Sequence, residues 1–272
     1  TYRYALQHSR NVAAVKIADE VGMTKVIKLA KEMGISTLTD QDYNLSTALG
    51  GLTHGVTPLE MVQAYGVLAN GGIKVQPTAI LKIVDRNGQV VEEHSIQEKR
   101  VVDEKDAAII TNMLESVING GTGGNAAIGR PAAGKTGTTD ASKDAWFVGY
   151  TPDLVAAVWI GDDYGSETLH GMTGGTTPAV MWGQFMANAL ANTPASDFSV
   201  PASAQSAVSE GYYNPVKAQP KKEAAKDEKA DKKDDKDKSK DEAVKDDSGS
   251  KDDATEQKSN SSKSKKSSKK DR

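Results

Sequence analysis

The stretch GRPAAGKTGTT, from Gly129 to Thr139, decides between two folds. Its first eight residues fit the P-loop pattern, in which a glycine and four free positions precede Gly134-Lys135-Thr136, and such a loop would cradle nucleotide phosphates. A P-loop follows a buried parallel strand and opens a helix. Here a glycine-rich run precedes Gly129, and the sequence that follows, GTTDASKDAWFVGY, is typical of a loop or a strand. Both flanks therefore disfavour a nucleotide site.

The sequence after the lysine predicts an antiparallel sheet. AWFVGYTPDLVAAVWIGDD, from Ala145 to Asp163, contains two apolar runs joined by the turn signal Thr-Pro-Asp at 151–153. Strands joined by so short a turn are antiparallel, whereas a P-loop fold needs parallel crossovers.

The tripeptide Lys135-Thr136-Gly137 has two further interpretations. One is a glycine-containing surface turn with an incidental lysine. The other is a lysine on an edge strand, with its side chain facing a cleft, followed by small residues that let a substrate peptide lie against the strand. A second motif is needed to choose between them.

The N-terminal half of the chain predicts helices. A helical pattern runs from TYRYALQHSRNVAAV to Gly22, and a second helix follows with Thr24 as its N-cap and Gly34 as its end. The clearest signal is GVTPLEMVQAYGVLANGG at 55–72. There Thr57, Pro58 and Glu60 form a capping box that opens a helix, and Asn-Gly-Gly ends it.

The remaining elements complete an α+β pattern. TAILKIVDRNGQVVEEH alternates around Asn87-Gly88, a strong hairpin signal. Further helices are expected from about Asp103 to Asn119 and from Pro178 onward. The apolar side of the last helix is expected to carry Met181, Trp182, Phe185, Met186 and Leu190. Helices, a series of hairpins and a helix that packs on the sheet predict an α+β fold.

Apolar residues are unevenly distributed along the 272 residues. We expect a folded domain over 1–190, a linker over 191–216, and a disordered, charged low-complexity tail over 217–272. The net charge of −3 divides into about −7 before Lys217 and about +4 from there onward. The basic end of the tail suits an anionic polymer. We expect a solubilising tail instead, and no nucleic-acid partner.

The start of the chain suggests a piece of a longer protein. The sequence contains no cysteine, and no apolar run reaches the roughly 18 to 20 residues that cross a bilayer. It begins with Thr1 inside an amphipathic pattern rather than with an initiator methionine or a signal peptide. We therefore expect an N-terminally truncated chain.

Ser9-Arg10-Asn11 supplies the second motif. Alone, such a triplet is a common helix cap. Combined with Lys-Thr-Gly in this order, it matches two boxes of penicillin-interacting serine acyl-transfer enzymes. Four stretches agree with this pairing: ALQHSRNVAAVKIA, GGLTHGVTPLEMVQAYGVLANGG, GKTGTTDASKDAWFVGYTPDLVAAVWIGDD and TTPAVMWGQFM. Together they resemble the penicillin-binding transpeptidase domain of bifunctional class A penicillin-binding proteins, and the tail resembles extensions of some Gram-positive members.

The resemblance implies a fold and a reaction. The expected fold is α+β, with a helical subdomain and an antiparallel sheet with packed helices, as in serine β-lactamases and transpeptidases. The expected reaction is D,D-transpeptidation. A serine attacks the D-Ala-D-Ala carbonyl of a peptidoglycan stem peptide and releases D-alanine, and an amine of a neighbouring strand then takes the acyl group. β-Lactams would inhibit it, and neither a cofactor nor a metal is expected.

The resemblance also assigns roles to residues of both motifs. Ser9 would belong to the proton shuttle, Asn11 would hold the substrate amide, and Lys135 would supply positive charge to the cleft. Three residues of the strand would bind substrate: Thr136 and Thr138 through hydroxyls that receive the terminal carboxylate, and Gly137 by leaving room. The backbone N–H of Thr138 would form half of the oxyanion hole.

The serine nucleophile itself is not found in the expected place. The family's first box, a serine with a lysine three residues later, precedes the Ser-x-Asn box, but here that spacing occurs only at 248–251, 262–265 and 267–270. We therefore expect the nucleophile to be absent from this chain, and a parent protein anchored at the outer face of the cytoplasmic membrane. Two alternatives stay open: a serine β-lactamase-like hydrolase and a non-catalytic wall-binding module.

Overall fold

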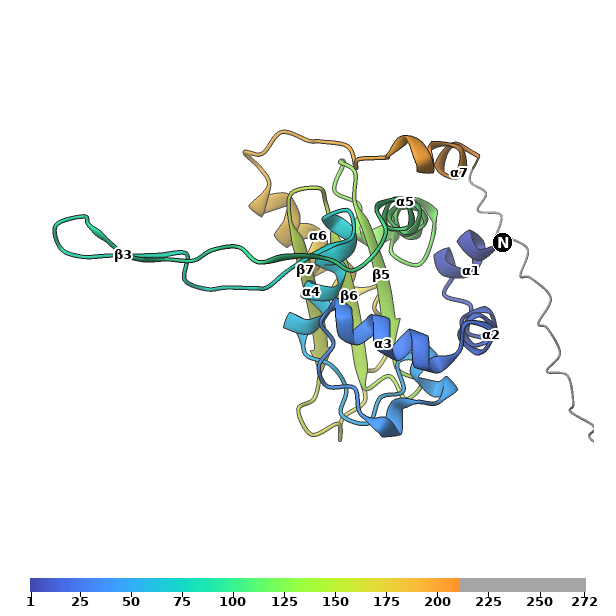
Figure 1. Ribbon diagram of the computed structural model, residues 1–272. Coiled ribbons are helices and arrows are strands. Elements are labelled where there is room, and N and C mark those ends of the chain that lie inside the picture. The colour runs from blue at the N-terminus through green and yellow to red at the C-terminus, as the bar shows by residue number, and fades with distance from the viewer. Residues whose placement is uncertain (211–272) are drawn as a thin grey trace, which may run out of the picture. The chain divides into compact units, whose positions relative to one another are not determined.

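A three-stranded antiparallel sheet forms the centre of the protein, in a computed structural model that describes residues 1–210. The strands are β5 (Ala133–Thr138), β6 (Asp144–Tyr150) and β7 (Val155–Gly161), in the order β5-β6-β7 (Figure 1). β6 pairs along its whole length with β7, from Asp144 opposite Gly161 to Tyr150 opposite Val155. The hairpin predicted around Thr-Pro-Asp is therefore confirmed. The expected tail, 217–272, lies outside the described residues.

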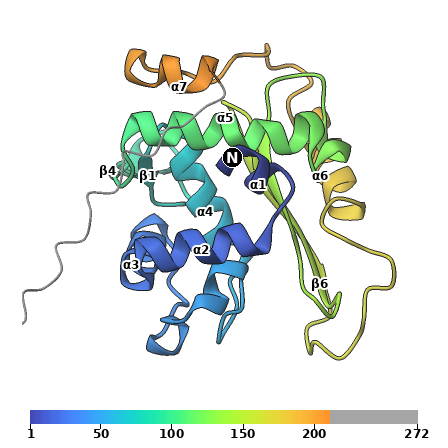
Figure 2. The same cartoon turned by 90° about the vertical axis from the view of Figure 1, so that its right-hand side faces the viewer.

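Helices cover both faces of this sheet, which confirms the α+β fold. α4 (Pro58–Ala69) and α6 (Thr177–Ala189) lie on opposite sides of it (Figure 2). α5 (Glu104–Gly120) packs against β5 and α4. Its Asp103 N-cap matches the predicted start, and the side chain of Asp103 accepts a hydrogen bond from the backbone N–H of Lys105.

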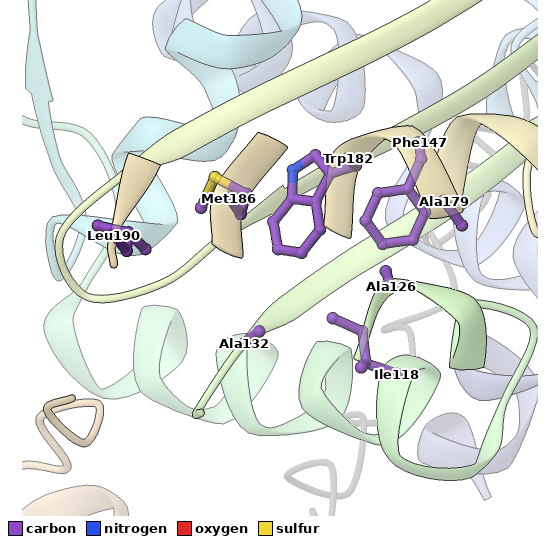
Figure 3. Packing of buried hydrophobic residues seen from close by; sticks show 8 residues of the cluster. All are labelled: Ile118, Ala126, Ala132, Phe147, Ala179, Trp182, Met186 and Leu190. Atoms are coloured by element: carbon purple, nitrogen blue, oxygen red, sulfur yellow. The ribbon is translucent and has the colours of Figure 1, made fainter. Parts of the chain in front are cut away.

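The core on the α6 side is built around two aromatic rings. Trp182 of α6 and Phe147 of β6 are both fully buried, with ring centroids 5.2 Å apart (Figure 3). Burial of two such rings is among the larger apolar contributions that a domain of this size can make. The Trp182 indole N–H donates to the carbonyl of Ala156, so its polar group is satisfied.

One expectation for α6 was wrong in part. Trp182, Met186 and Leu190 are buried as expected, but Met181 is 47% exposed and Phe185 is 55% exposed. The buried residues repeat at four-residue intervals and face the sheet. Met181 and Phe185 each stand one residue, or about 100°, away from this stripe and face outward.

The N-terminal region differs from its predicted boundaries at two points. It forms α1 (Tyr2–Gln7), α2 (Asn11–Val21) and α3 (Met23–Met33), so the first predicted helix is interrupted. Thr24 is not an N-cap, because it lies inside α3. Gly22 occupies the cap position instead, with a φ of 89° that glycine adopts without strain, and thereby turns the chain between the two helices.

The capping box of α4 is confirmed and extends beyond the helix. Thr57 accepts a hydrogen bond from the backbone N–H of Glu60, and Glu60 accepts from the backbone N–H of Thr57. The other carboxylate oxygen of Glu60 accepts from the N–H and hydroxyl of Ser36 and from the N–H of Thr37, at 2.7, 2.7 and 3.1 Å. Glu60 thus joins α4 to the segment after α3.

A second buried carboxylate fastens the segment between α3 and α4. This segment contains the 3-10 helices η1 (Asp40–Asp42) and η2 (Leu45–Leu49). Asp42 accepts four hydrogen bonds, from the N–H and hydroxyl groups of Thr39 and Thr53. These bonds hold the pKa of Asp42 well below its usual range. Hydrogen bonds to the carboxylates of Asp42 and Glu60 therefore fix this segment, which contains no long helix and no strand.

Replacing Glu60 by glutamine is expected to destabilise the protein by about 2 kcal/mol or more, because an NH₂ group would then face N–H donors. Burial acts to raise the pKa of Glu60, but hydrogen bonds from Thr57 and Ser36 outweigh it and bring the pKa to about 2, from 4.5. Because the folded-state pKa is lowered, the ionised Glu60 contributes fully to the stability of the folded state above about pH 4.5. That contribution is lost as the pH falls toward 2. Thermal melts between pH 3 and 7 measure both effects.

The exposed Glu20 provides the matched control, since Glu20→Gln removes the same charge from the surface of α2. Its melting temperature should stay within about 1 °C of wild type, against a fall of roughly 4 to 8 °C for Glu60→Gln. Equal melting temperatures for the two variants would contradict a stabilising role for the hydrogen bonds that Glu60 accepts.

A projecting hairpin interrupts the helical part of the chain. β2 (Lys82–Val84) and β3 (Val90–Glu93) pair around the predicted Asn-Gly turn and extend away from the sheet (Figure 1). At its base, β1 (Ile73–Val75) pairs with β4 (Glu98–Arg100). This second pair was not predicted.

Residues 191–210, which were expected to belong to the linker, contribute to the core as far as the structure describes them. Phe198 packs against the ring of Tyr150, with centroids 5.6 Å apart. The 3-10 helix η4 (Ala202–Ala204) and α7 (Gln205–Ser209) lie against α5, where Ala204 is fully buried. None of the helices among residues 1–210 is long and apolar enough to cross a membrane.

Candidate active site

Lys135 lies on β5, an edge strand of the three-stranded sheet. Lys135 pairs with Val148 of β6. The strand that follows β5 in the chain is thus its antiparallel partner, and no helix lies between the two. No helix begins at Lys135-Thr136, and no parallel strand precedes them in the described part of the chain. The geometry therefore rules out the P-loop and agrees with the edge-strand interpretation.

The Lys135 side chain reaches the connection between α1 and α2. Its Nζ donates to Ser9 Oγ at 2.8 Å and to the carbonyl oxygen of Thr136 at 3.0 Å. Ser9 and Lys135 are 126 positions apart in the sequence. The fold thus brings together the two motifs that the sequence paired.

Burial lowers the pKa of Lys135 to about 8, from 10.5. The cause is the loss of hydration of the ammonium group, which disfavours the charged form. At neutral pH the side chain still carries its proton, so it places a positive charge at the edge of the sheet. A lysine with a shifted pKa beside a polar cluster is typical of functional sites.

Ser9 occupies a strained backbone position. Its φ is 51°, in the left-handed region that few residues other than glycine adopt. Arg10 N–H donates to Ala5 O at 2.8 Å and Ser9 N–H donates to Leu6 O at 3.2 Å, the two bonds of a Schellman motif that ends α1. Glycine usually fills this position. Ser9 holds this conformation at a cost in backbone strain that glycine would not incur.

Asn11 is the first residue of α2 and is exposed. Its side chain makes no hydrogen bond with the other residues of 1–210, which leaves both its donor and its acceptor available. Asn11 therefore follows Ser9 by two residues in the chain, without a side-chain hydrogen bond to Ser9 or Lys135.

The three residues after Lys135 are held by close packing. Thr136 Oγ1 lies 2.7 Å from the hydroxyl of Thr122, and Thr138 Oγ1 accepts the N–H of Gly174 at 3.0 Å. Gly137 stands opposite Trp146, and an added Cβ would lie 3.2 Å from the Cβ of Trp146. Each threonine hydroxyl thus has a protein partner.

Strand alternation divides these side chains between the two faces of the sheet. Lys135 and position 137 point to one face, and Thr136 and Thr138 point to the other. Because β5 is the edge strand, a ligand along its open side can reach groups on both faces. Thr138 is exposed, which is compatible with such a ligand.

Two contributors to the site were missed by sequence reasoning. One is Thr122, which follows α5, and the other is Gly174 in the loop before α6. A Cβ at Gly174 would collide with the carbonyl oxygens of Trp146 and Gly137, so only glycine fits against this strand. The signal was present in the glycine-rich runs GGTGG and TGG, but nothing in the sequence connected them to the lysine.

Among residues 1–210, a further polar feature is a surface cavity. This cavity, lined by Lys31, Ser36 and Gln63, shares no residue with the candidate active site. The carboxylate in that cavity, Glu60, is already satisfied by the hydrogen bonds of the α4 cap. Among residues 1–210, no group of three or more His, Cys, Asp or Glu side chains could hold a metal ion.

Comparison with known proteins agrees with this geometry. The chain is 40% identical over 202 residues to penicillin-binding protein 1A of Aquifex aeolicus, which covers 74% of this chain and 27% of that protein. It is 40% identical over 210 residues to penicillin-binding protein 2D of Bacillus subtilis, covering 74% of this chain and 29% of that protein. The chain thus spans less than a third of the length of these curated relatives.

Solved structures show the same fold. Penicillin-binding protein 1A from Haemophilus influenzae superimposes with a TM-score of 0.68 at 27% identity, over 74% of this chain and 36% of that one. PonA1 from Mycobacterium tuberculosis, in complex with penicillin V, gives a TM-score of 0.64 at 30% identity, over 72% of this chain and 58% of that one. The penicillin binding protein transpeptidase domain model matches residues 1–175. The chain therefore belongs to the penicillin-binding protein transpeptidase domain family and contains part of that domain.

Proposed function

We propose that this chain is the C-terminal part of a peptidoglycan D,D-transpeptidase that works through a serine acyl-enzyme. The observation that carries the proposal is the 2.8 Å contact between Lys135 Nζ and Ser9 Oγ. In the reaction, a serine oxygen bonds to the penultimate D-alanine carbonyl carbon, the peptide C–N bond breaks, and D-alanine leaves with a proton. An acceptor amine then forms a new C–N bond and releases the serine.

Lys135 would attract the terminal carboxylate of the stem peptide or of a β-lactam. An ammonium group has three N–H donors, and Ser9 Oγ and the Thr136 carbonyl take two of them. The third makes only a long contact of 3.5 Å with Thr136 Oγ1, which a ligand carboxylate at the open edge of β5 would replace. Half-burial strengthens such a contact, because little water competes for the charge.

Ser9 would pass a proton to the leaving amine. Since Lys135 donates to Ser9 Oγ, the proton of the Ser9 hydroxyl is free to point toward a reacting group. Asn11, exposed and two residues further on, would hold the amide of the substrate backbone. Thr138 would offer its backbone N–H to the developing oxyanion, as the edge position of β5 permits.

The nucleophile would come from a region outside this chain. This proposal is supported by the chain's coverage of 27% and 29% of its curated relatives. The serine-lysine spacings at 248–251, 262–265 and 267–270 fall outside the described residues. We propose that the complete protein is anchored at the outer face of the cytoplasmic membrane, with peptidoglycan stem peptides as its substrates and β-lactams as inhibitors.

Labelling with fluorescent penicillin V tests this function in two proteins. The longer protein that contains this chain should bind one penicillin covalently per molecule and release it slowly, whereas the 272-residue chain should not be labelled. Rapid nitrocefin turnover by the longer protein would indicate a β-lactamase-like hydrolase instead. Binding to wall material without covalent labelling would indicate a non-catalytic module.

A further inference from the structure

Thr122 lies where three segments of the site meet. Its backbone N–H donates to the carbonyl of Gln7 in α1 at 3.2 Å, and its hydroxyl is 2.7 Å from the hydroxyl of Thr136 in β5. The loop before α6 passes so close that a Cβ at Gly175 would collide with the Thr122 carbonyl oxygen. One residue therefore contacts both motif-bearing segments and the loop that covers the strand.

The contact with α1 fixes the position of Ser9. Gln7 is two residues before Ser9, and a Cβ at Gly121 would lie 2.5 Å from the Gln7 carbonyl oxygen. This close approach leaves the end of α1 little freedom relative to the end of α5. The backbone at 121–122 therefore sets where Ser9 stands, and the Thr122 side chain extends from the same place to β5.

The contact with β5 joins the hydroxyls of Thr122 and Thr136, and it can set which of the two donates its proton to the other. Thr136 Oγ1 lies 2.7 Å from Thr122 Oγ1 and 3.5 Å from Lys135 Nζ. A hydroxyl has one proton to donate and can accept from other donors. If Thr122 donates to Thr136, the proton of Thr136 is free for an anion beside Lys135. Chained hydroxyls also polarise one another, which strengthens the final bond.

We propose that Thr122 is a positioning residue for carboxylate recognition. Its hydroxyl fixes the rotamer of Thr136 and donates to it, so that Thr136 can donate to the ligand carboxylate next to the Lys135 ammonium. This role rests on the proposed function, since it assigns the recognised group to the carboxylate of a stem peptide or a β-lactam. Thr122 itself acts through Thr136.

The first test measures the Thr136 rotamer in the 272-residue chain, without any reaction. Thr122→Val removes the hydroxyl at nearly constant shape, and Thr122→Ser retains it. Three-bond NMR couplings of the Thr136 methyl group should show one rotamer in wild type and in Thr122→Ser, and averaged rotamers in Thr122→Val. An unchanged Thr136 rotamer in Thr122→Val overturns the proposal.

The second test measures acylation of the longer protein by penicillin V and by its methyl ester, which lacks the carboxylate. For penicillin V, Thr122→Val should raise the half-saturating concentration about three- to ten-fold, the effect of one hydrogen bond, and leave the maximal rate within about two-fold. For the ester, the variant should match wild type. Thr122→Ser should restore the penicillin V value.

Thr78→Val provides the control, because this threonine lies in the projecting hairpin and bonds only to its neighbour Ile80. Equal losses for penicillin V and its ester would show that Thr122 merely supports the fold, and would overturn the carboxylate role. If the wild-type protein is not acylated at all, the proposed function fails. The Thr136 rotamer then still decides whether Thr122 positions that residue.

Discussion

Replacing Lys135 by alanine in the longer protein is expected to slow β-lactam acylation by about ten-fold to more than a hundred-fold. The change removes the cation that we propose to bind the ligand carboxylate, and it leaves Ser9 Oγ without its donor at 2.8 Å. A charge-assisted hydrogen bond contributes roughly 1.5 to 3 kcal/mol, which corresponds to that range of rates. Stopped-flow measurement of the second-order acylation rate with penicillin V checks this prediction.

Lys143→Ala is the matched control for this experiment. Lys143 lies in the turn between β5 and β6, eight positions after Lys135, and its side chain is exposed. The control loses the same charge near the same strand and should keep its acylation rate within about two-fold. If Lys135→Ala acylates as fast as Lys143→Ala, the assignment of Lys135 to the site is wrong.

The pH dependence provides a second measurement on Lys135. Burial sets its pKa at about 8, so the cation is lost as the pH rises through 8, and acylation should decline there. The alanine variant should lack this decline. The stability of the folded state depends on pH in the opposite direction. The unfolded lysine titrates near 10.5, so between about 8 and 10.5 the unfolded chain binds more protons and the folded state gains stability with rising pH.

The sequence predicted the elements whose signals are local. The α4 cap needed only Thr57 and Glu60, three residues apart, and the β6–β7 hairpin needed only two apolar runs and a turn. In both cases the residues that carry the sequence signal are the same residues that form the cap or the hairpin. The pairing of β1 with β4 escaped prediction because these three-residue strands are separated by the whole projecting hairpin. The alternation in β1, Ile-Lys-Val, is too short to identify a strand, and β4, Glu-Lys-Arg, does not alternate.

The site was predictable to the extent that its motifs are short and contiguous. Lys135 and Ser9 were both found, and the structure joins them. The break between α1 and α2 was missed, because the left-handed position that ends α1 holds Ser9 rather than the glycine that usually marks it. Thr122 was missed for another reason. Its role comes from contacts with α1 and β5, which exist only after the chain has folded.

Replacing Ser9 by alanine in the longer protein is expected to reduce acylation by about a hundred-fold or more, the usual contribution of a positioned proton-transfer group. The variant keeps the Cβ but loses the hydroxyl that accepts from Lys135. A β-lactam nitrogen that leaves the carbonyl carbon then lacks the hydroxyl that we propose as its proton donor. Stopped-flow acylation with penicillin V measures the rate, and Ser95→Ala in the projecting hairpin is the control.

Ser9→Gly separates the hydroxyl from the backbone. With φ at 51°, glycine should relieve strain of roughly 1 to 2 kcal/mol and leave the melting temperature equal or higher, although it too lacks the hydroxyl. If the hydroxyl transfers the proton, Ser9→Gly and Ser9→Ala lose acylation to the same extent. Normal acylation by Ser9→Gly, with a loss only in Ser9→Ala, would show that position 9 matters through its backbone conformation and not as a proton shuttle.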